Sequence, residues 1–149
     1  VDTRGDILYR GAISTRKHED VTDFIDELHE AILPAIETVG GFAFIKGIGV
    51  GAPNGNYYKG TVEYAPNLTW KGIVPLASLI KEKFGLPAWL TNDANAAAVG
   101  EMMYGAARGM RDFIMITLGT GVGSGIVANG QLIYGHDGFA GELGHTIII

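Results

Sequence analysis

The stretch DFIMITLGTGVGSGIVANG, residues 112–130, has glycine at four alternate positions between two apolar runs. The apolar runs, 113–118 and 126–128, predict two strands, and the glycines between them predict the tip of a β-hairpin. A tip with so few side chains lets phosphate oxygens come close to backbone N–H groups. The structural alternative is a glycine-rich turn with a β-bulge.

This stretch matches neither of the two common phosphate-binding loops. A Walker A loop would continue with Gly-Lys and then Ser or Thr, and a dinucleotide-binding loop would open directly into a helix. The hydroxyls of Thr117, Thr120 and Ser124 can add hydrogen-bond donors around the tip. The hairpin is therefore a candidate phosphate site of another kind, built mainly from backbone amides.

Upstream of the hairpin, strands and helices alternate. Residues 7–13, 42–50 and 88–91 predict strands, and the spacing of apolar residues over 18–38, 75–84 and 94–104 predicts helices. This order is typical of an α/β layer that contains parallel strands. After residue 112 the pattern changes to strands and turns, with a last strand over 146–149. We therefore place a domain boundary near residues 105–111.

Composition excludes several classes of function. The chain has 149 residues, a net charge of −5 and no basic run, which argues against a nucleic-acid partner. No window of about 18 apolar residues predicts a membrane span. The chain has no cysteine, so it forms no disulfide and no thiolate metal site of its own, which suits a cytoplasmic protein.

A few polar residues are candidates for binding a ligand. Asn92 and Asp93 stand where a strand ends and a helix begins, which is where open α/β sheets bind ligands. Asp93 can accept a proton from a hydroxyl, although both residues are also favoured helix caps. Asn67, in the loop before the second helix, is a further candidate or only a turn former.

Glu142 and His145 form a second polar group. They are three residues apart and would share one face of a helical turn. A carboxylate and an imidazole together suit the recognition of a polyol, since both can pair with hydroxyls. His145 can also be read as a metal ligand or as a structural histidine.

Together, five segments resemble the ROK family of sugar kinases and repressors. They are GVGAP (49–53), APNLTW (65–70), TNDANAAA (91–98), LGTGVGSG (118–125) and GHDGFAGELGH (135–145). The last three, in this order and spacing, are highly specific to the family. The resemblance spans nearly the whole chain and is greatest for the glucokinase branch.

The resemblance implies an α/β chain with the actin-like ATPase (ribonuclease H-like) fold. Residues 1–107 would be the smaller N-terminal, sugar-binding α/β domain without its first strand, and residues 108–149 the beginning of a second, nucleotide-binding domain. The implied activity is that of an ATP-dependent hexose kinase that phosphorylates the 6-hydroxyl of glucose or a related sugar. Such an enzyme would use ATP with Mg²⁺ and would form a homodimer or homotetramer.

The resemblance also assigns roles to single residues. Asp93 would be the catalytic base. The sugar would be bound by Asn67, Asn92, Asp93, Glu142 and His145. The phosphates of ATP would be bound by Gly119, Thr120, Gly121 and Gly123. His145 would also join three cysteines around a structural Zn²⁺ in the complete protein.

The sequence departs from the family pattern at both ends. The family begins with a phosphate loop of the form Asp-x-Gly-Gly-Thr and continues past Gly-His into a cysteine-rich zinc segment with another sugar-binding Glu, and neither occurs in these 149 residues. We therefore expect a fragment with little or no kinase activity by itself. The alternatives are a sugar-responsive repressor of the same family, an N-acetylhexosamine or fructose kinase of that family, and a non-catalytic binding domain.

Overall fold

The first part of the chain is dominated by one long helix. The computed structural model describes residues 1–119 and 121–146, and α1 (Val21–Thr38) is the longest element in it. Asp20 caps this helix by accepting a hydrogen bond at 2.7 Å from the backbone N–H two residues on. The helical spacing turns Phe24 and Ile25 into the core. Pro34 lies inside the helix without ending it, so the predicted helix is confirmed apart from its first three residues.

Two strand predictions near the N-terminus need correction. Residues 7–13 form no regular secondary structure, and Leu8 and Tyr9 are about half exposed. A strand needs a neighbour that completes its backbone hydrogen bonds, and the described sheets do not include this segment. Residues 42–50 begin with a 3-10 turn (Phe42–Phe44), and the strand β1 (Ile48–Ala52) starts only after it.

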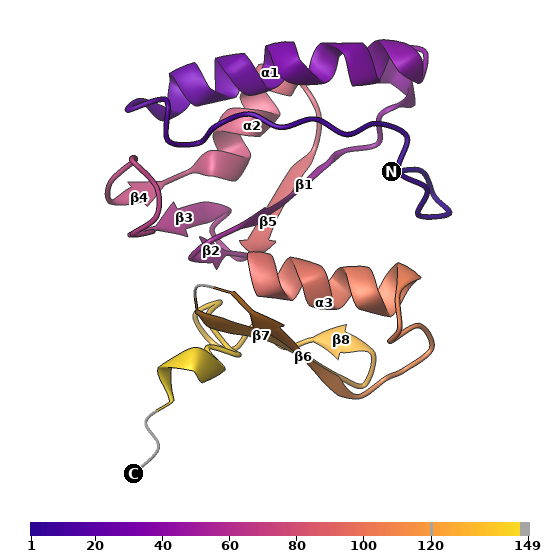
Figure 1. The fold of residues 1–149 in the computed structure, drawn as a ribbon, viewed down its shortest axis with the longest axis vertical. Coiled ribbons are helices and arrows are strands. Elements are labelled where there is room, and N and C mark those ends of the chain that lie inside the picture. Colours follow the sequence, from indigo (N-terminus) through magenta and orange to yellow (C-terminus); the bar gives the residue numbers. More distant parts are fainter. Residues whose placement is uncertain (120, 147–149) are drawn as a thin grey trace.

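Two parallel strands, β1 and β5 (Ala88–Asn92), form the central sheet. Their register pairs Ala52 with Asn92, so both strands end at the same edge. Helix α2 (Leu76–Phe84) packs on α1 and β5, whereas α3 (Asp93–Tyr104) packs on β1 and lies below the sheet in Figure 1. The predicted α/β layers with parallel strands are thereby confirmed.

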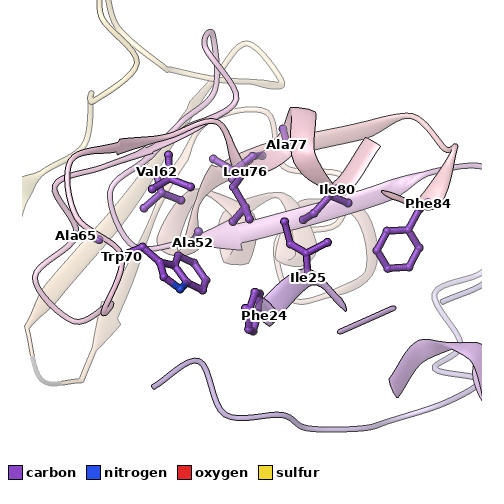
Figure 2. Packing of buried hydrophobic residues seen from close by; sticks show 12 residues of the cluster. Phe24, Ile25, Ala52, Val62, Ala65, Trp70, Leu76, Ala77, Ile80 and Phe84 are labelled. Carbon is purple, nitrogen blue, oxygen red and sulfur yellow. The ribbon is translucent and has the colours of Figure 1, made fainter. Parts of the chain in front are cut away.

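The core lies between the helices, the central sheet and a small antiparallel sheet. That small sheet joins β2 (Gly55–Asn56), β3 (Thr61–Glu63) and β4 (Ile73–Val74). Figure 2 shows the buried side chains of this core, which include Phe24, Ile25, Val62, Trp70, Leu76 and Ile80. Full burial of one such aliphatic or aromatic side chain contributes roughly 1.5–3 kcal/mol. These contacts hold α1 and α2 against the strands.

A third sheet, of β6 (Phe113–Leu118), β7 (Val122–Ala128) and β8 (Gln131–Leu132), packs beneath α3 (Figure 1). β6 has the predicted bounds, but β7 starts at Val122 rather than at 126. Gly123 and Gly125 therefore belong to the strand and not to the hairpin tip. Both face α3, and a Cβ atom at Gly123 would lie 3.0 Å from the Cβ of Ala94. Only Gly119 and Gly121 remain as described glycines of the tip.

After β8 the chain forms a loop and then a 3-10 turn (Leu143–His145). The strand predicted over 146–149 is not seen at Thr146, which has no regular secondary structure. Residues 147–149 lie outside the described part of the chain. Within residues 1–119 and 121–146, no helix has the length and apolar character needed to cross a membrane.

Candidate functional site

The start of α3 carries two of the polar residues that the sequence predicted, Asn92 and Asp93. β5 runs into α3 without a loop, so Asn92 is both the last residue of the strand and the cap of the helix. Its Oδ1 accepts hydrogen bonds from the backbone N–H groups of Ala94 at 2.7 Å and Asn95 at 3.2 Å. Asp93, the first residue of the helix, is exposed and accepts from the N–H of Ala94 at 2.9 Å.

Asn92 also connects this helix start to the C-terminal segment. Its Nδ2 donates to Oε1 of Glu142 at 3.2 Å, across 50 residues of sequence. Asn92 thus uses its oxygen for the helix and its nitrogen for the carboxylate. Asp93 follows Asn92 directly in the chain, so an amide and two carboxylates are the candidate contacts for a hydroxyl-bearing ligand at this helix start.

His145 is the last residue of the 3-10 turn that follows Glu142, but it does not belong to a closed cluster of polar side chains. Its side chain is 85% exposed, and its Nε2 lies 3.9 Å from Oε2 of Glu142. Among residues 1–119 and 121–146, no three His, Cys, Asp or Glu side chains come together as a metal site. The chain has no cysteine to complete a zinc site around His145.

The hairpin that carries the glycine tip packs on the first turn of α3 through β7. A Cβ atom at Gly123 of β7 would lie 3.0 Å from the Cβ of Ala94. Gly119 and Gly121 are exposed, and a Cβ atom at either would meet nothing within 4 Å. The N–H of Gly119 already donates to the carbonyl of Gly121 at 3.0 Å, inside the turn. The predicted phosphate contact at Thr120 lies outside the described residues.

Asn67 lies apart from this group. It is exposed and lines a pocket together with Arg16 and Glu19, and neither Asn92 nor Glu142 lines that pocket. The loop of Asn67 is held by the Thr69 hydroxyl, which donates to the carbonyl of His18 at 2.6 Å. The structure therefore joins Asn92 to Glu142 by a hydrogen bond, with Asp93 next to Asn92 in the chain. It does not bring Asn67 into direct contact with them.

Sequence reasoning missed the residues that support this site. Asn56 is fully buried and donates to the backbone of Asp137, and Ser124 is buried and donates to the carbonyl of Gly141. Asn56 stands among glycines and tyrosines and looks like an ordinary turn residue. Ser124 looks like a hydroxyl of the glycine tip, whereas it faces the loop that carries Glu142.

Comparison with known proteins places the chain in a family. The model of the ROK family matches residues 1–149, and this chain belongs to the ROK family. It is 38% identical to a glucokinase of Halalkalibacterium halodurans over an alignment of 152 positions that covers 99% of this chain and 45% of that protein. It is equally identical, 38% over 150 residues, to a xylose repressor of Caldicellulosiruptor bescii, covering 97% of this chain and 36% of the repressor.

A solved structure agrees with the fold. The ROK family glucokinase from Streptomyces griseus, in complex with glucose and AMPPNP, superimposes with a TM-score of 0.83 at 37% identity. The match covers 100% of this chain and 46% of the glucokinase chain. The mixed α/β structure therefore matches ROK glucokinases, whose fold is that of actin-like ATPases. The chain spans less than half the length of the relatives that it matches.

Proposed function

We propose that this chain is the sugar-binding part of an ATP-dependent hexose kinase that phosphorylates the 6-hydroxyl of glucose or a related sugar. The observation that carries the proposal is the hydrogen bond between Asn92 and Glu142, together with the exposed Asp93 that follows Asn92 in the chain. The Streptomyces griseus relative binds glucose and AMPPNP, which supports the choice of both substrates. In this reading Asn92 and Glu142 bind sugar hydroxyls and Asp93 faces the hydroxyl that reacts.

Asp93 is proposed as the catalytic base. The attacking hydroxyl oxygen forms a bond to the γ-phosphorus, the bond between the γ-phosphorus and the β,γ-bridging oxygen breaks, and the hydroxyl proton passes to Asp93. General-base assistance of this kind contributes roughly 10²- to 10⁴-fold in rate. The start of α3 adds a favourable field for negative charge, because the first N–H groups of a helix carry partial positive charge.

The glycine tip is proposed to receive the phosphates. Gly119 and Gly121 leave open space where side chains would stand, so a phosphate can approach the backbone there. The net charge of −5 makes backbone amides and bound cations the means of offsetting the phosphate charge. Mg²⁺ bound with ATP would supply positive charge that offsets the negative charge of the phosphates. Residues 1–119 and 121–146 do not complete a Zn²⁺ site, and the proposed transfer does not use Zn²⁺.

Asn67 and His145 are proposed as outer contacts of the sugar. Both are exposed. Asn67 lies in the segment APNLTW and His145 ends the segment GHDGFAGELGH. The division of labour between residues 1–107, for the sugar, and 108–149, for the nucleotide, is part of the same proposal. The glycine-rich β6–β7 hairpin belongs to the second of these parts.

The second candidate is a sugar-responsive repressor of the same family. The observation that favours it is the sequence identity to the xylose repressor of Caldicellulosiruptor bescii, which is the same as the identity to the glucokinase of Halalkalibacterium halodurans. A repressor would bind its sugar at the same residues but would transfer no phosphate. The exposed carboxylate of Asp93 and the open tip favour the kinase, since binding alone needs neither.

A panel of sugars tests these proposals. The full-length protein is incubated with ATP, Mg²⁺ and glucose, fructose, N-acetylglucosamine, N-acetylmannosamine or xylose, and ADP formation is followed. We expect sugar-dependent ADP release, greatest with glucose. Sugar binding by calorimetry without ADP release would instead support the repressor. Binding of none of the sugars would overturn both.

A further inference from the structure

The loop that carries Glu142 belongs to no helix or strand, but a hydrogen bond holds its C-terminal end. Residues 135–142 follow β8 and lead into the 3-10 turn. The hydroxyl of Ser124 in β7 donates to the carbonyl of Gly141. The contact is close, because a Cβ atom at Gly141 would lie 2.9 Å from the carbonyl oxygen of Ser124. β7 therefore seats the loop directly before Glu142.

The near part of the loop is held by Asn56. Its side chain is fully buried, and its Nδ2 donates to the carbonyl of Asp137 at 2.9 Å. Its Oδ1 accepts from the N–H groups of Tyr58 at 3.1 Å and Lys59 at 3.2 Å. The fit requires glycine at position 138, where a Cβ atom would lie 2.9 Å from Oδ1 of Asn56. A buried amide with its donor and acceptor both engaged fixes the local geometry, because leaving either unpaired is costly.

Tyr58 supplies a second tie to the same loop. Its hydroxyl donates to the carbonyl of Gly135 at 2.9 Å. Beside it, Tyr57 stacks on Tyr134 with ring centroids 4.0 Å apart and an interplanar angle of 11°. Burial raises the pKa of the Tyr134 hydroxyl, and the neighbouring Tyr57 and Tyr58 raise it further. The ties cross 77 and 81 residues of sequence and connect β2 and the turn that follows it with the loop.

We propose that Asn56 and Tyr58 are positioning residues for Glu142 and act through the backbone of residues 135–142. The inference rests on the proposed function, since a sugar hydroxyl is the ligand that Glu142 would bind. The bond from Asn92 to Glu142 is 3.2 Å long, at the long end of the range for an N–H···O bond, so a small shift of the loop breaks it. Releasing the loop would also let its backbone sample other conformations at the expense of binding.

Tyr58→Phe in the full-length protein is the cleanest test. It removes one hydroxyl from an exposed ring and leaves the ring packing in place. We expect the Kd for glucose, measured by calorimetry, to rise about 3- to 10-fold, which is the range for one lost hydrogen bond. The Kd for AMPPNP should stay within about twofold, because Glu142 is not proposed to contact the nucleotide. Asn56→Asp, which keeps the acceptor and removes the donor to Asp137, should weaken glucose binding more strongly.

Two further variants show whether the effect passes through Glu142. Tyr104→Phe, at the opposite end of α3, is the matched control and should bind glucose like the wild type. In a Glu142→Gln background, Tyr58→Phe should cause no additional loss, because residues that act through one group are not additive. Hydrogen exchange of peptides over 135–146 should be faster in Tyr58→Phe and Asn56→Asp than in the wild type.

The outcomes separate this inference from the proposed function. If the wild type binds glucose and Tyr58→Phe binds it equally well, the positioning role is overturned and the kinase proposal stands. Equal losses for glucose and AMPPNP, or full additivity with Glu142→Gln, would also overturn it, since they indicate general destabilisation. If the wild type binds no sugar of the panel, the proposed function fails and the inference fails with it.

Discussion

Gly125 of β7 and Ala98 of α3 meet so closely that a Cβ atom at Gly125 would lie 2.6 Å from the Cβ of Ala98. Ala98 is completely buried, and Gly125 is buried as well. The same Cβ atom would lie 3.1 Å from the carbonyl oxygen of Ala94. Glycine at 125 is therefore a packing requirement between a strand and a helix, and it stands away from the hairpin tip.

Gly125→Ala should destabilise the protein by about 1–3 kcal/mol, because an added methyl group has no space against α3. Gly100→Ala, within α3, is the control. Its Cβ atom would meet nothing within 4 Å, and alanine is the better helix former by about 1 kcal/mol. Chemical denaturation of both variants checks the prediction, and equal stability of the two would contradict it.

Asp93→Asn should remove catalysis and leave sugar binding. Asparagine keeps an oxygen that can accept from the N–H of Ala94 but cannot take a proton. We expect kcat to fall about 10²- to 10⁴-fold while the Kd for glucose changes little. Steady-state kinetics and calorimetry measure the two quantities. Near-normal turnover would show that another group is the base.

Two substitutions of Asn92 separate its roles as helix cap and as partner of Glu142. Asn92→Asp keeps the accepting oxygen and should preserve the stability of α3, but its carboxylate would oppose that of Glu142. Asn92→Ala loses the cap and should destabilise the protein by about 1 kcal/mol. We expect both to weaken glucose binding, and the loss of the cap should lower the melting temperature of Asn92→Ala.

Gly121→Val should raise the KM for ATP without unfolding the protein. The open space around Gly121 accepts a side chain, so stability should change little. The same side chain would stand where a phosphate is proposed to approach the backbone. Kinetics at saturating glucose check this. Gly109→Ala is not a suitable control, because Gly109 has a φ of 84°, which a residue with a side chain rarely adopts. An unchanged KM for ATP would place the phosphates elsewhere.

Glu27 should make stability depend on pH in the acid range. Hydrogen bonds from Lys17, at 3.0 Å, and from His18 lower the pKa of Glu27 below its ordinary value of 4.5. A carboxylate with a lowered folded-state pKa stabilises the fold above its unfolded-state pKa and loses that contribution as the pH falls through the folded-state value. The melting temperature of the wild type should therefore exceed that of Glu27→Gln at pH 7 and converge with it below pH 4.5.

Much of the fold follows from patterns within single segments. The helical spacing of apolar residues in α1 and the Asn92-Asp93 start of α3 are local signals, and the structure has both helices within a few residues of the predicted bounds. The strand predicted at 7–13 failed because apolar character alone does not supply a neighbouring strand. β7 was predicted too short because the alternation of glycine shows small residues but not what lies opposite them.

Only some polar residues of the candidate site could be predicted from the sequence. Asn92 and Glu142 could be named from their types and setting, and the structure joins them by a hydrogen bond. Their roles, and those of Asp93 and Asn67, stay predictions. Asn56 was invisible, because its importance lies in contacts 81 residues away and no local spacing reports such a contact.

Helix α3 is flanked by glycine on two sides. Gly51 of β1 would place a Cβ atom 2.9 Å from that of Ala96, just as Gly125 would meet Ala98. The distance between the β1–β5 sheet and the β6–β7–β8 sheet is thus set by the diameter of α3 at its alanine positions. The strands and the helix share the space between them. A methyl group gained by a strand can be tolerated only where the helix gives one up, so these positions should change in evolution as pairs.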